Sequence, residues 1–341
     1  MEISRGWAHT AFPVDDASRV GEARRFAGLL TQSLAWTEVE AGRLALVVTE
    51  LATNLLRHAT MGRLLIAARP AFNDVEVISI DEGPGIVDPS QSMRDGYSTG
   101  GGSPGTGLGA IRRLASDFDL YSTVPQDGKP GGTLCVARVR AGKAAPPAHG
   151  GIQVGAVAIC APGETVNGDS WAFATDGVNA SLMVADGLGH GPEAAKASSA
   201  AADLFLQQPF VGTVAFLGDA HAALQTTRGA AVCCLRMDAA NVRCTGAGNV
   251  VSRIVSGVFD RSMVTQHGTV GMQMRRAQEA VMDLPEHALA IVHSDGIETR
   301  WDSTRLHPLL DRDPALVAAL LLRDHCRGRD DATVVVLRRI P

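Results

Sequence analysis

The chain has 341 residues, of which 45% are hydrophobic and 20% charged, and its formal net charge is −5. This length exceeds one typical domain and the composition is that of a globular protein, so two domains are expected and disorder is excluded. The slight acidity and the lack of a basic run argue against nucleic-acid binding. No apolar run is long enough to span a bilayer and no signal peptide is recognisable, so we expect a cytoplasmic protein without a membrane partner. The six cysteines lack metal-ligand spacing and are expected to be reduced.

The first 140 residues alternate helix and strand signals. Helices are predicted at residues 14–34, 39–59 and 110–118, and strands at 63–68, 75–80 and 132–139. Helices on one face of a sheet would form an α/β layer. Residues 141–151 are rich in Ala, Gly and Pro and form the predicted linker between domains at 1–140 and 152–341.

The second domain is strand-rich. Strands are predicted at residues 152–159, 170–174, 180–185, 230–237, 241–245, 250–256, 288–293 and 332–337. Helices are predicted at residues 191–207, 211–227 and 314–326. Two packed sheets flanked by helices would fit this pattern.

Three polar residues share one face of the second predicted helix. Glu50 and Asn54 are four residues apart, and His58 follows one turn later. The amide oxygen of Asn54 could bind a magnesium ion that bridges phosphates, and the Glu50 carboxylate could orient or deprotonate an attacking hydroxyl. Spacing alone favours the plainer interpretation of solvated surface side chains.

Glycine-rich segments further along the chain favour a nucleotide pocket. Asp81 follows a strand and precedes a sharp turn, where its carboxylate can accept a hydrogen bond from an amino group such as that of adenine. Small residues before the next helix let backbone N–H groups approach phosphates, although one such segment alone is also typical of a flexible loop. The candidate nucleotide contacts are Asn54, His58, Asp81, Gly83, Gly85, Gly105, Thr106, Gly107, Leu108 and Gly109.

Residues 10–140 resemble the GHKL ATPase family, in particular its branch of RsbT-type serine kinases and anti-sigma factors. The motifs at 49–54, 81–86 and 105–114 are similar to the N, G1 and G2 boxes of that family. The resemblance implies a Bergerat-type α/β sandwich that binds ATP and Mg²⁺, with Asn54 as magnesium ligand, Glu50 as catalytic base and Asp81 as adenine reader. No helical hairpin with a phospho-acceptor histidine precedes these motifs, which disfavours a histidine kinase.

Four aspartates of the second domain stand at the edges of predicted strands: Asp169, Asp186, Asp295 and Asp330. Each Asp-Gly pair taken alone is more simply a turn. Carboxylates that converge across packed sheets would repel one another unless a divalent cation lay between them. All-oxygen ligation selects magnesium or manganese rather than zinc, and two such ions can bind a phosphate and lower the pKa of a bridging water.

Residues 151–341 resemble the RsbX and SpoIIE branch of metal-dependent serine/threonine phosphatases. The similar segments are residues 186–195, 246–249, 294–298 and 330–333. The resemblance implies a PPM-type β-sandwich flanked by helices (αββα) that holds two Mn²⁺ or Mg²⁺ ions. The implied metal ligands are Asp169, Asp186, the Gly187 carbonyl, Asp295, Asp330 and Asp331.

Two features near this site bear on the substrate. His190 could protonate a leaving serine oxygen, although a histidine between glycines is more often a solvated loop residue. No arginine near the start of the second domain is placed to bind the substrate phosphate, so specificity is expected to come from protein docking.

Together the two domains predict a bifunctional regulator of a partner-switching pathway. The first is expected to phosphorylate a serine of a STAS-domain protein, and the second to remove phosphate from the same or a related protein. Two alternatives stay open: the first domain only binds a sigma factor or another signalling protein, or it is the ATP sensor of the phosphatase. Glu50 favours kinase chemistry, because a pure binder needs no base.

Overall fold

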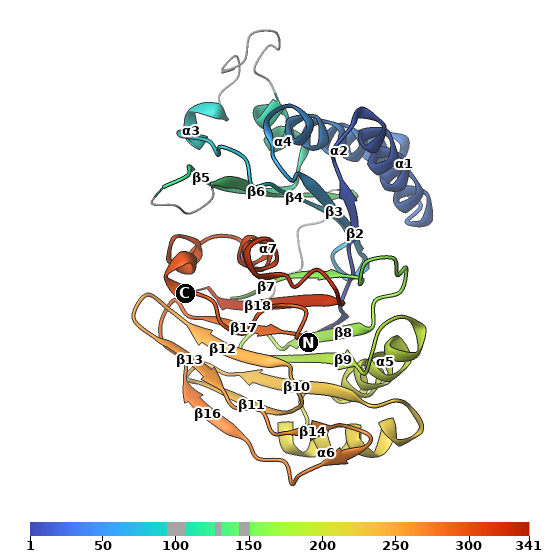
Figure 1. Ribbon diagram of the computed structural model, residues 1–341, viewed down its shortest axis with the longest axis vertical. Coiled ribbons are helices and arrows are strands. Elements are labelled where there is room, and N and C mark those ends of the chain that lie inside the picture. The colour runs from blue at the N-terminus through green and yellow to red at the C-terminus, as the bar shows by residue number, and fades with distance from the viewer. Residues whose placement is uncertain (94–106, 127–130, 143–150, 341) are drawn as a thin grey trace. The chain divides into compact units, whose positions relative to one another are not determined.

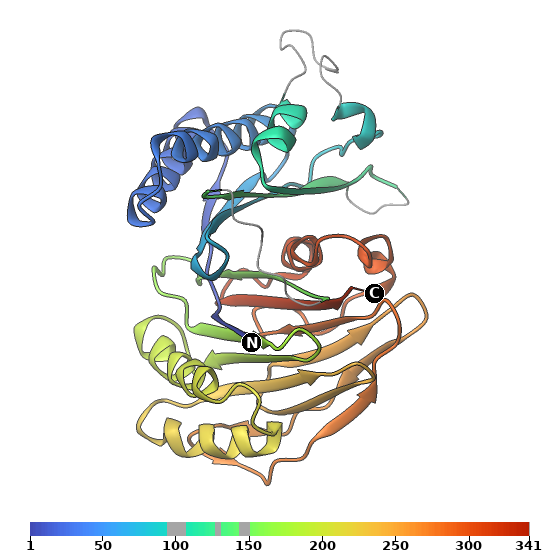
Figure 2. The same cartoon turned by 180° about the vertical axis from the view of Figure 1, so that it is seen from behind.

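The computed structural model describes residues 1–93, 107–126, 131–142 and 151–340, and the chain forms two compact units (Figures 1 and 2). The inserted unit comprises His9–Pro147. The split unit comprises Met1–Ala8 together with Ala148–Pro341. No helix among the described residues is long and apolar enough to cross a membrane.

The inserted unit is an antiparallel sheet with helices on one face (Figure 1). Its strands lie in the order β2-β3-β4-β6-β5. Their bounds are β2 (Thr10–Pro13), β3 (Arg63–Arg69), β4 (Asp74–Ile80), β5 (Asp117–Thr123) and β6 (Gly132–Arg140). The helices are α1 (Ala17–Ser33), α2 (Glu38–His58), α3 (Pro89–Ser92) and α4 (Gly107–Leu114), with a 3₁₀ turn at Pro70–Phe72.

Helix α2 begins and packs as its sequence predicts. Thr37 and Glu40 form a capping box, in which each side chain satisfies a backbone N–H of the first turn. Leu44, Leu51 and Leu55 are buried against the sheet, and each contributes on the order of 1.5–3 kcal/mol of apolar burial. This packing fixes the rotation of α2 and therefore the positions of the polar residues beside the apolar face.

One predicted helix of this unit is partly wrong. Residues 110–118 were expected to be helical, but α4 ends at Leu114 and Asp117 starts strand β5. The Ser116 N–H donates to the Arg138 carbonyl, which begins the pairing of β5 with β6. Polar and apolar residues alternate over residues 117–121, as in a strand with one buried face.

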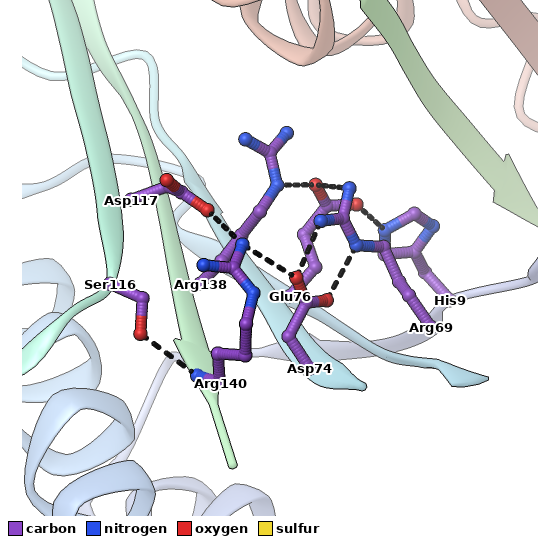
Figure 3. A network of polar contacts seen from close by, with 8 residues as sticks. All are labelled: His9, Arg69, Asp74, Glu76, Ser116, Asp117, Arg138 and Arg140. Atoms are coloured by element: carbon purple, nitrogen blue, oxygen red, sulfur yellow. Dashed lines mark hydrogen bonds and ion pairs between the residues drawn. The ribbon is translucent and has the colours of Figure 1, made fainter. Parts of the chain in front are cut away.

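A buried network of charged side chains lies on the face of this sheet opposite the helices (Figure 3). Val75 and Val77 pack in the core under the helices, so the side chains that alternate with them on β4 face the other way. Arg69 binds Asp74 through two hydrogen bonds of 2.7 Å. The network comprises His9, Arg69, Asp74, Glu76, Ser116, Asp117, Arg138 and Arg140.

The split unit is built on two antiparallel sheets. The six-stranded sheet has the order β1-β8-β9-β10-β11-β16, and the five-stranded sheet the order β13-β12-β17-β18-β7. The first contains β1 (Glu2–Arg5), β8 (Asp169–Thr175), β9 (Ala180–Gly187), β10 (Ala230–Met237), β11 (Asn241–Ala247) and β16 (Ala280–Asp283). The second contains β7 (Ile152–Ile159), β12 (Val251–Val255), β13 (Asp260–Met263), β17 (Leu289–His293) and β18 (Ala332–Arg339).

Helices cover the outer faces of the two sheets (Figure 1). Helices α5 (Pro192–Gln207) and α6 (Thr213–Ala223) pack on the six-stranded sheet, and α7 (Pro314–His325) packs on the five-stranded sheet. A short hairpin, β14 (Gly268–Thr269) and β15 (Gln273–Met274), and two 3₁₀ turns, Leu224–Thr226 and Ser303–Leu309, complete the unit. All six cysteines are free. The expected double sheet flanked by helices is confirmed.

The first domain was expected to span residues 1–140. This range needs a correction at its start, because Met1–Ala8 belongs to the split unit. Strand β1 pairs antiparallel with β8, with Glu2 opposite Thr175 and Arg5 opposite Ala172. The Trp7 ring packs edge-on against Trp171 with a centroid separation of 4.5 Å. An amphipathic strand of four residues is too short to be recognised from the sequence alone. Along the sequence, the inserted unit is therefore preceded and followed by strands of the split unit.

We expect Trp7→Ala to destabilise the split unit by about 3–5 kcal/mol, because it removes a buried aromatic side chain. The carbonyl of residue 7 would still accept the 3.1 Å hydrogen bond from Trp171 Nε1, so the loss reports the ring packing. Urea unfolding measures the loss of stability, and amide hydrogen exchange measures the protection of β8. Ile3→Ala, on the exposed part of β1, is the control and should cost far less. Unchanged protection of β8 in Trp7→Ala would show that the N-terminal segment is not part of this fold.

Candidate nucleotide and metal sites

The structure brings two of the predicted nucleotide motifs together at the start of α4. Glu50 and Asn54 lie on α2, and both are half-buried. A Cβ built on Gly107 would lie 3.2 Å from Glu50 Oε2 and 3.4 Å from Asn54 Oδ1. A side chain at position 107 would fill the space in front of both polar groups, so glycine keeps this space open beside the first turn of α4. Leu108 and Gly109 continue the helix, whereas Gly105 and Thr106 lie outside the described residues.

Asp81 is held at the end of β4 by backbone donors. Its Oδ1 accepts hydrogen bonds from the N–H groups of Gly83 (2.7 Å) and Thr133 (3.2 Å). The following turn requires glycine at Gly85, which has a φ of 72°. A Cβ on Gly83 would lie 3.1 Å from the carbonyl oxygen of His58 at the end of α2. The turn after Asp81 therefore packs against the end of the helix that carries Glu50 and Asn54. The side chain of His58, at this end of the helix, is exposed.

The strand register of the split unit places two of the predicted metal ligands side by side. Asp169 begins β8 and Asp186 is the penultimate residue of β9, and the two are direct partners in the antiparallel pairing of these strands. Opposite residues of an antiparallel pair project their side chains to the same face, with Cβ atoms about 4.5–5.5 Å apart. The two carboxylates therefore emerge next to each other.

The second pair of aspartates comes from the other sheet. Asp295 follows β17 by two residues and Asp330 precedes β18 by two. Because β17 and β18 are antiparallel neighbours with His293 opposite Val334, both aspartates stand at the same end of that sheet. A cavity of about 560 Å³ is bordered by Asp186 of the first pair and by both aspartates of the second. It is lined by Asp186, Leu188, Gly189, Ala231, Gly248, Asn249, His267, Gly268, Thr269, Asp295 and Asp330.

The electrostatics of these carboxylates favour a cation. Burial, together with the neighbouring charges of Asp169 and Asp295, raises the pKa of Asp186 to about 9. Burial also raises the pKa of Asp169 to about 7, against a 2.7 Å hydrogen bond from the Ser294 hydroxyl. Asp295 accepts a 2.5 Å hydrogen bond from Asn249, and its pKa is raised by burial and by Asp330.

Among these carboxylates, that of Asp186 gives the strongest indication that the site fits a cation. Among the described residues, neither a hydrogen-bond donor nor a cation contacts its carboxylate. The donor set, all carboxylate oxygen, suits Mg²⁺ or Mn²⁺. Over the same part of the chain no three His, Cys, Asp or Glu side chains are already close enough to hold a metal ion. A bound cation would therefore have to draw these carboxylates together.

Asp331, predicted as a further metal ligand, has other contacts. Its Oδ1 accepts from the Ala161 N–H at 2.8 Å, and its Oδ2 accepts from the Gly168 N–H at 3.0 Å. Both oxygens therefore fix the segment that leads to Asp169. These contacts hold the segment before Asp169 in place, and the role of Asp331 as a metal ligand stays a prediction.

His190, predicted as a proton donor, lies in the turn after Asp186. Its Nδ1 is 2.7 Å from Glu164 Oε1, the side chain is 61% exposed, and the residue is not among those that line the cavity. Gly187, expected to offer its carbonyl, lies where helix α5 passes closest to β9. A Cβ on Gly187 would be 2.1 Å from the carbonyl oxygen of Ala194, so only glycine allows this approach.

Sequence reasoning missed several polar residues around the cavity, among them Asn249, His267 and Arg228. Asn249 and His267 line it, and a guanidinium nitrogen of Arg228 would lie 3.7 Å from a Cβ on Gly189 at its rim. Asn249 closes the motif at 246–249, which offered a signal that was interpreted only as part of a strand pair. Arg228 and His267 lie in connecting segments without a recognisable motif, so only the folded chain brings them to the cavity.

Comparison with known proteins identifies the family of the inserted unit. The family model of the histidine kinase-like ATPase domain matches residues 12–136. The serine/threonine-protein kinase RsbT of Bacillus subtilis (strain 168) is 34% identical over 102 residues, which are 29% of this chain and 76% of RsbT. The chain belongs, through its inserted unit, to the histidine kinase-like ATPase family, as the three glycine and acidic motifs predicted.

Solved structures extend the likeness to the split unit. A chain described with the bacterial stressosome, a modular system adapted to control secondary messenger signalling, is 27% identical with a TM-score of 0.52. The match covers 55% of this chain and 99% of that one, more of this chain than the inserted unit alone can supply. RsbX in complex with magnesium is 20% identical with a TM-score of 0.49, over 55% of this chain and 95% of that one. The expected architecture, an ATPase-type unit joined to a double sheet flanked by helices, is confirmed.

Proposed function

We propose that this chain is a bifunctional regulator of partner switching, whose split unit is a metal-dependent phosphoserine protein phosphatase and whose inserted unit is a protein serine kinase. The observation that carries the phosphatase is the Asp186 carboxylate. It lies in a cavity with Asp295 and Asp330, its strand partner is Asp169, and no cation of the described part of the chain pairs with it. Such a cluster is stable in the ionised form only around a cation.

The residues proposed to hold the cations are Asp169, Asp186, the Gly187 carbonyl, Asp295 and Asp330. When bound, Mn²⁺ or Mg²⁺ supplies a water of lowered pKa and an electrophile for the phosphoryl oxygens. The protein's own part is to place carboxylates from both sheets around one cavity, where a cation can draw them together. Ser294 and Asn249 orient two of them through hydrogen bonds of 2.7 and 2.5 Å.

The kinase proposal rests on the position of Glu50 and Asn54 beside Gly107 at the start of α4. We propose that ATP binds with its phosphates at the start of α4, that Asn54 binds the Mg²⁺ ion, and that Asp81 accepts a hydrogen bond from adenine. Glu50 then orients and deprotonates the serine hydroxyl of the substrate. The similarity to RsbT, which is a serine/threonine-protein kinase, supports this direction of transfer.

The proposed substrate of both reactions is a STAS-domain protein in the cytoplasm. A second candidate is that the inserted unit senses ATP for the phosphatase. This candidate is favoured by the topology, because β1 and β7 of the split unit flank the inserted unit in the sequence. Binding of ATP without phosphoryl transfer, with a change in phosphatase rate, would support the sensor instead of the kinase.

Asp81→Asn tests the nucleotide pocket. Asn keeps an oxygen for the Gly83 and Thr133 N–H groups, so the turn should persist. It replaces a charged acceptor by a donor on the other side, which should cost about 1–3 kcal/mol of ATP affinity. Isothermal titration calorimetry measures this loss. Equal affinities of the variant and the wild type would remove Asp81 from the pocket.

The phosphatase proposal is tested with a phosphoserine STAS-domain protein and the full chain. We expect release of phosphate that needs Mn²⁺ or Mg²⁺, stops with EDTA and returns when the metal is restored. The wild-type protein should also gain thermal stability on adding the metal, because a ligand that binds only the folded state stabilises it. Hydrolysis that persists in EDTA would contradict the proposal.

A further inference from the structure

The cavity with the three aspartates has a wall that the proposed metal site does not use. This wall is the segment His267–Gly268–Thr269. His267 is the one imidazole among the described residues that line the cavity. An imidazole is the side chain best suited to give or take a proton near neutral pH.

The backbone on both sides of His267 is fixed. Gln266 donates its N–H to the Gly246 carbonyl at 2.9 Å and accepts the Gly248 N–H at 2.8 Å. Val270 exchanges two hydrogen bonds with Ala230, of 3.0 and 2.9 Å. His267 thus stands between two anchored residues of a short segment, and its position relative to the cavity is set by strands β10 and β11.

The other side chains of the cavity leave the role of proton donor open. Asp186, Asp295 and Asp330 are assigned to the cations, and the Asn249 amide binds Asp295. Leu188, in the turn after Asp186, lines the cavity but has no proton to give. His190, in the same turn, is bonded to Glu164 and exposed.

We propose that His267 is the general acid that protonates the leaving serine oxygen, an inference that rests on the proposed phosphatase function. A water oxygen forms a bond to phosphorus as the bond from phosphorus to serine Oγ breaks. Serine Oγ takes a proton from the His267 imidazolium and leaves as the hydroxyl. The attacking water gives its proton to solvent, and the imidazole is reprotonated from solvent. The products are the serine protein and inorganic phosphate.

The test compares two leaving groups in the full-length protein with saturating Mn²⁺. The serine alkoxide is a strongly basic leaving group and needs protonation, whereas 2,4-dinitrophenolate leaves without it. His267→Gln should lower kcat for a phosphoserine peptide by roughly 10²–10⁴-fold and leave kcat for 2,4-dinitrophenyl phosphate nearly unchanged. The Mn²⁺-induced thermal shift should equal that of the wild type. His287→Gln, an exposed histidine outside the cavity, is the matched control.

Four results would overturn the proposal. An equal fall with both substrates would mean that His267 binds phosphate or supports the wall. No fall with either would mean that it takes no part. A selective fall in His190→Gln in place of His267→Gln would assign the acid to His190. A wild-type protein that hydrolyses neither substrate would remove the phosphatase function along with the inference, whereas the first three results leave that function intact.

Discussion

Asp186→Asn is expected to abolish metal-dependent hydrolysis of phosphoserine while leaving the protein folded. Asp186 is the carboxylate with the most strongly raised pKa of the cavity, and no donor from the described residues bonds to it, so it depends most on a cation. Losing a direct ligand should cost more than the roughly 10–100-fold that follows the loss of an outer hydrogen-bond partner. The measurement is phosphate release with Mn²⁺, with Asp219→Asn on an exposed face of α6 as the control.

The pH dependence and the Mn²⁺ dependence of stability should also change in Asp186→Asn. These changes distinguish a loss of metal binding from a defect in folding. The pKa of Asp186 rises from 3.8 in an unfolded chain to about 9 in the metal-free fold. The folded state then holds the proton more tightly, so metal-free wild type should lose stability as pH rises from about 4 to about 9. Asn cannot ionise, so the variant should show a flatter pH profile and no gain from Mn²⁺. A full gain in melting temperature with Mn²⁺ would contradict the assignment.

Glu50→Gln is expected to lower phosphoryl transfer from ATP to the partner by roughly 10²–10⁴-fold, the usual contribution of a general base. Gln has nearly the same shape as Glu, so the packing of α2 and the close approach of α4 at Gly107 should be kept. Binding of ATP should therefore survive. The measurement pairs the rate of partner phosphorylation with calorimetric ATP affinity.

Glu38→Gln is the control for this kinase variant. Glu38 is an exposed carboxylate on the first turn of the same helix, and its loss should change neither rate nor affinity. A wild-type rate in Glu50→Gln would show that Glu50 is not the base. Absence of phosphorylation by the wild type, with normal ATP binding, would favour the sensor or the binding module over the kinase.

Long periodic segments and motif-bearing turns could be predicted from the sequence. Strong local signals are carried by helix α2, with its capping box and apolar stripe, and by strand β9, which contains Asp186. Strand β1 could not be found, because its four residues gain their stability from pairing with β8, which lies more than 160 residues away in the sequence. Strand β5 carried an alternating pattern, but the helix that precedes it masked the change of period.

The candidate sites show the same division between local and long-range information. Motifs identified Asp169 and Asp186 as candidates, and their pairing across β8 and β9 now explains why they meet. The backbone contacts of Asp331 could not be predicted, because they depend on which of its oxygens face the backbone of residues 161–168. His267 has no motif at all, and only the anchoring of its segment to β10 and β11 places it at the cavity.

The claim that one chain both adds and removes a phosphoryl group is tested most directly by one time course. The full-length protein is mixed with a STAS-domain partner, limiting radiolabelled ATP and Mn²⁺, and the label on the partner serine is followed. We predict that the label rises and then falls with the wild type, rises and stays with Asp186→Asn, and does not rise with Glu50→Gln. Partner labelled beforehand should lose its label with Glu50→Gln but not with Asp186→Asn. Loss of both reactions in either single variant, or label that falls as fast with Asp186→Asn as with the wild type, would contradict the account.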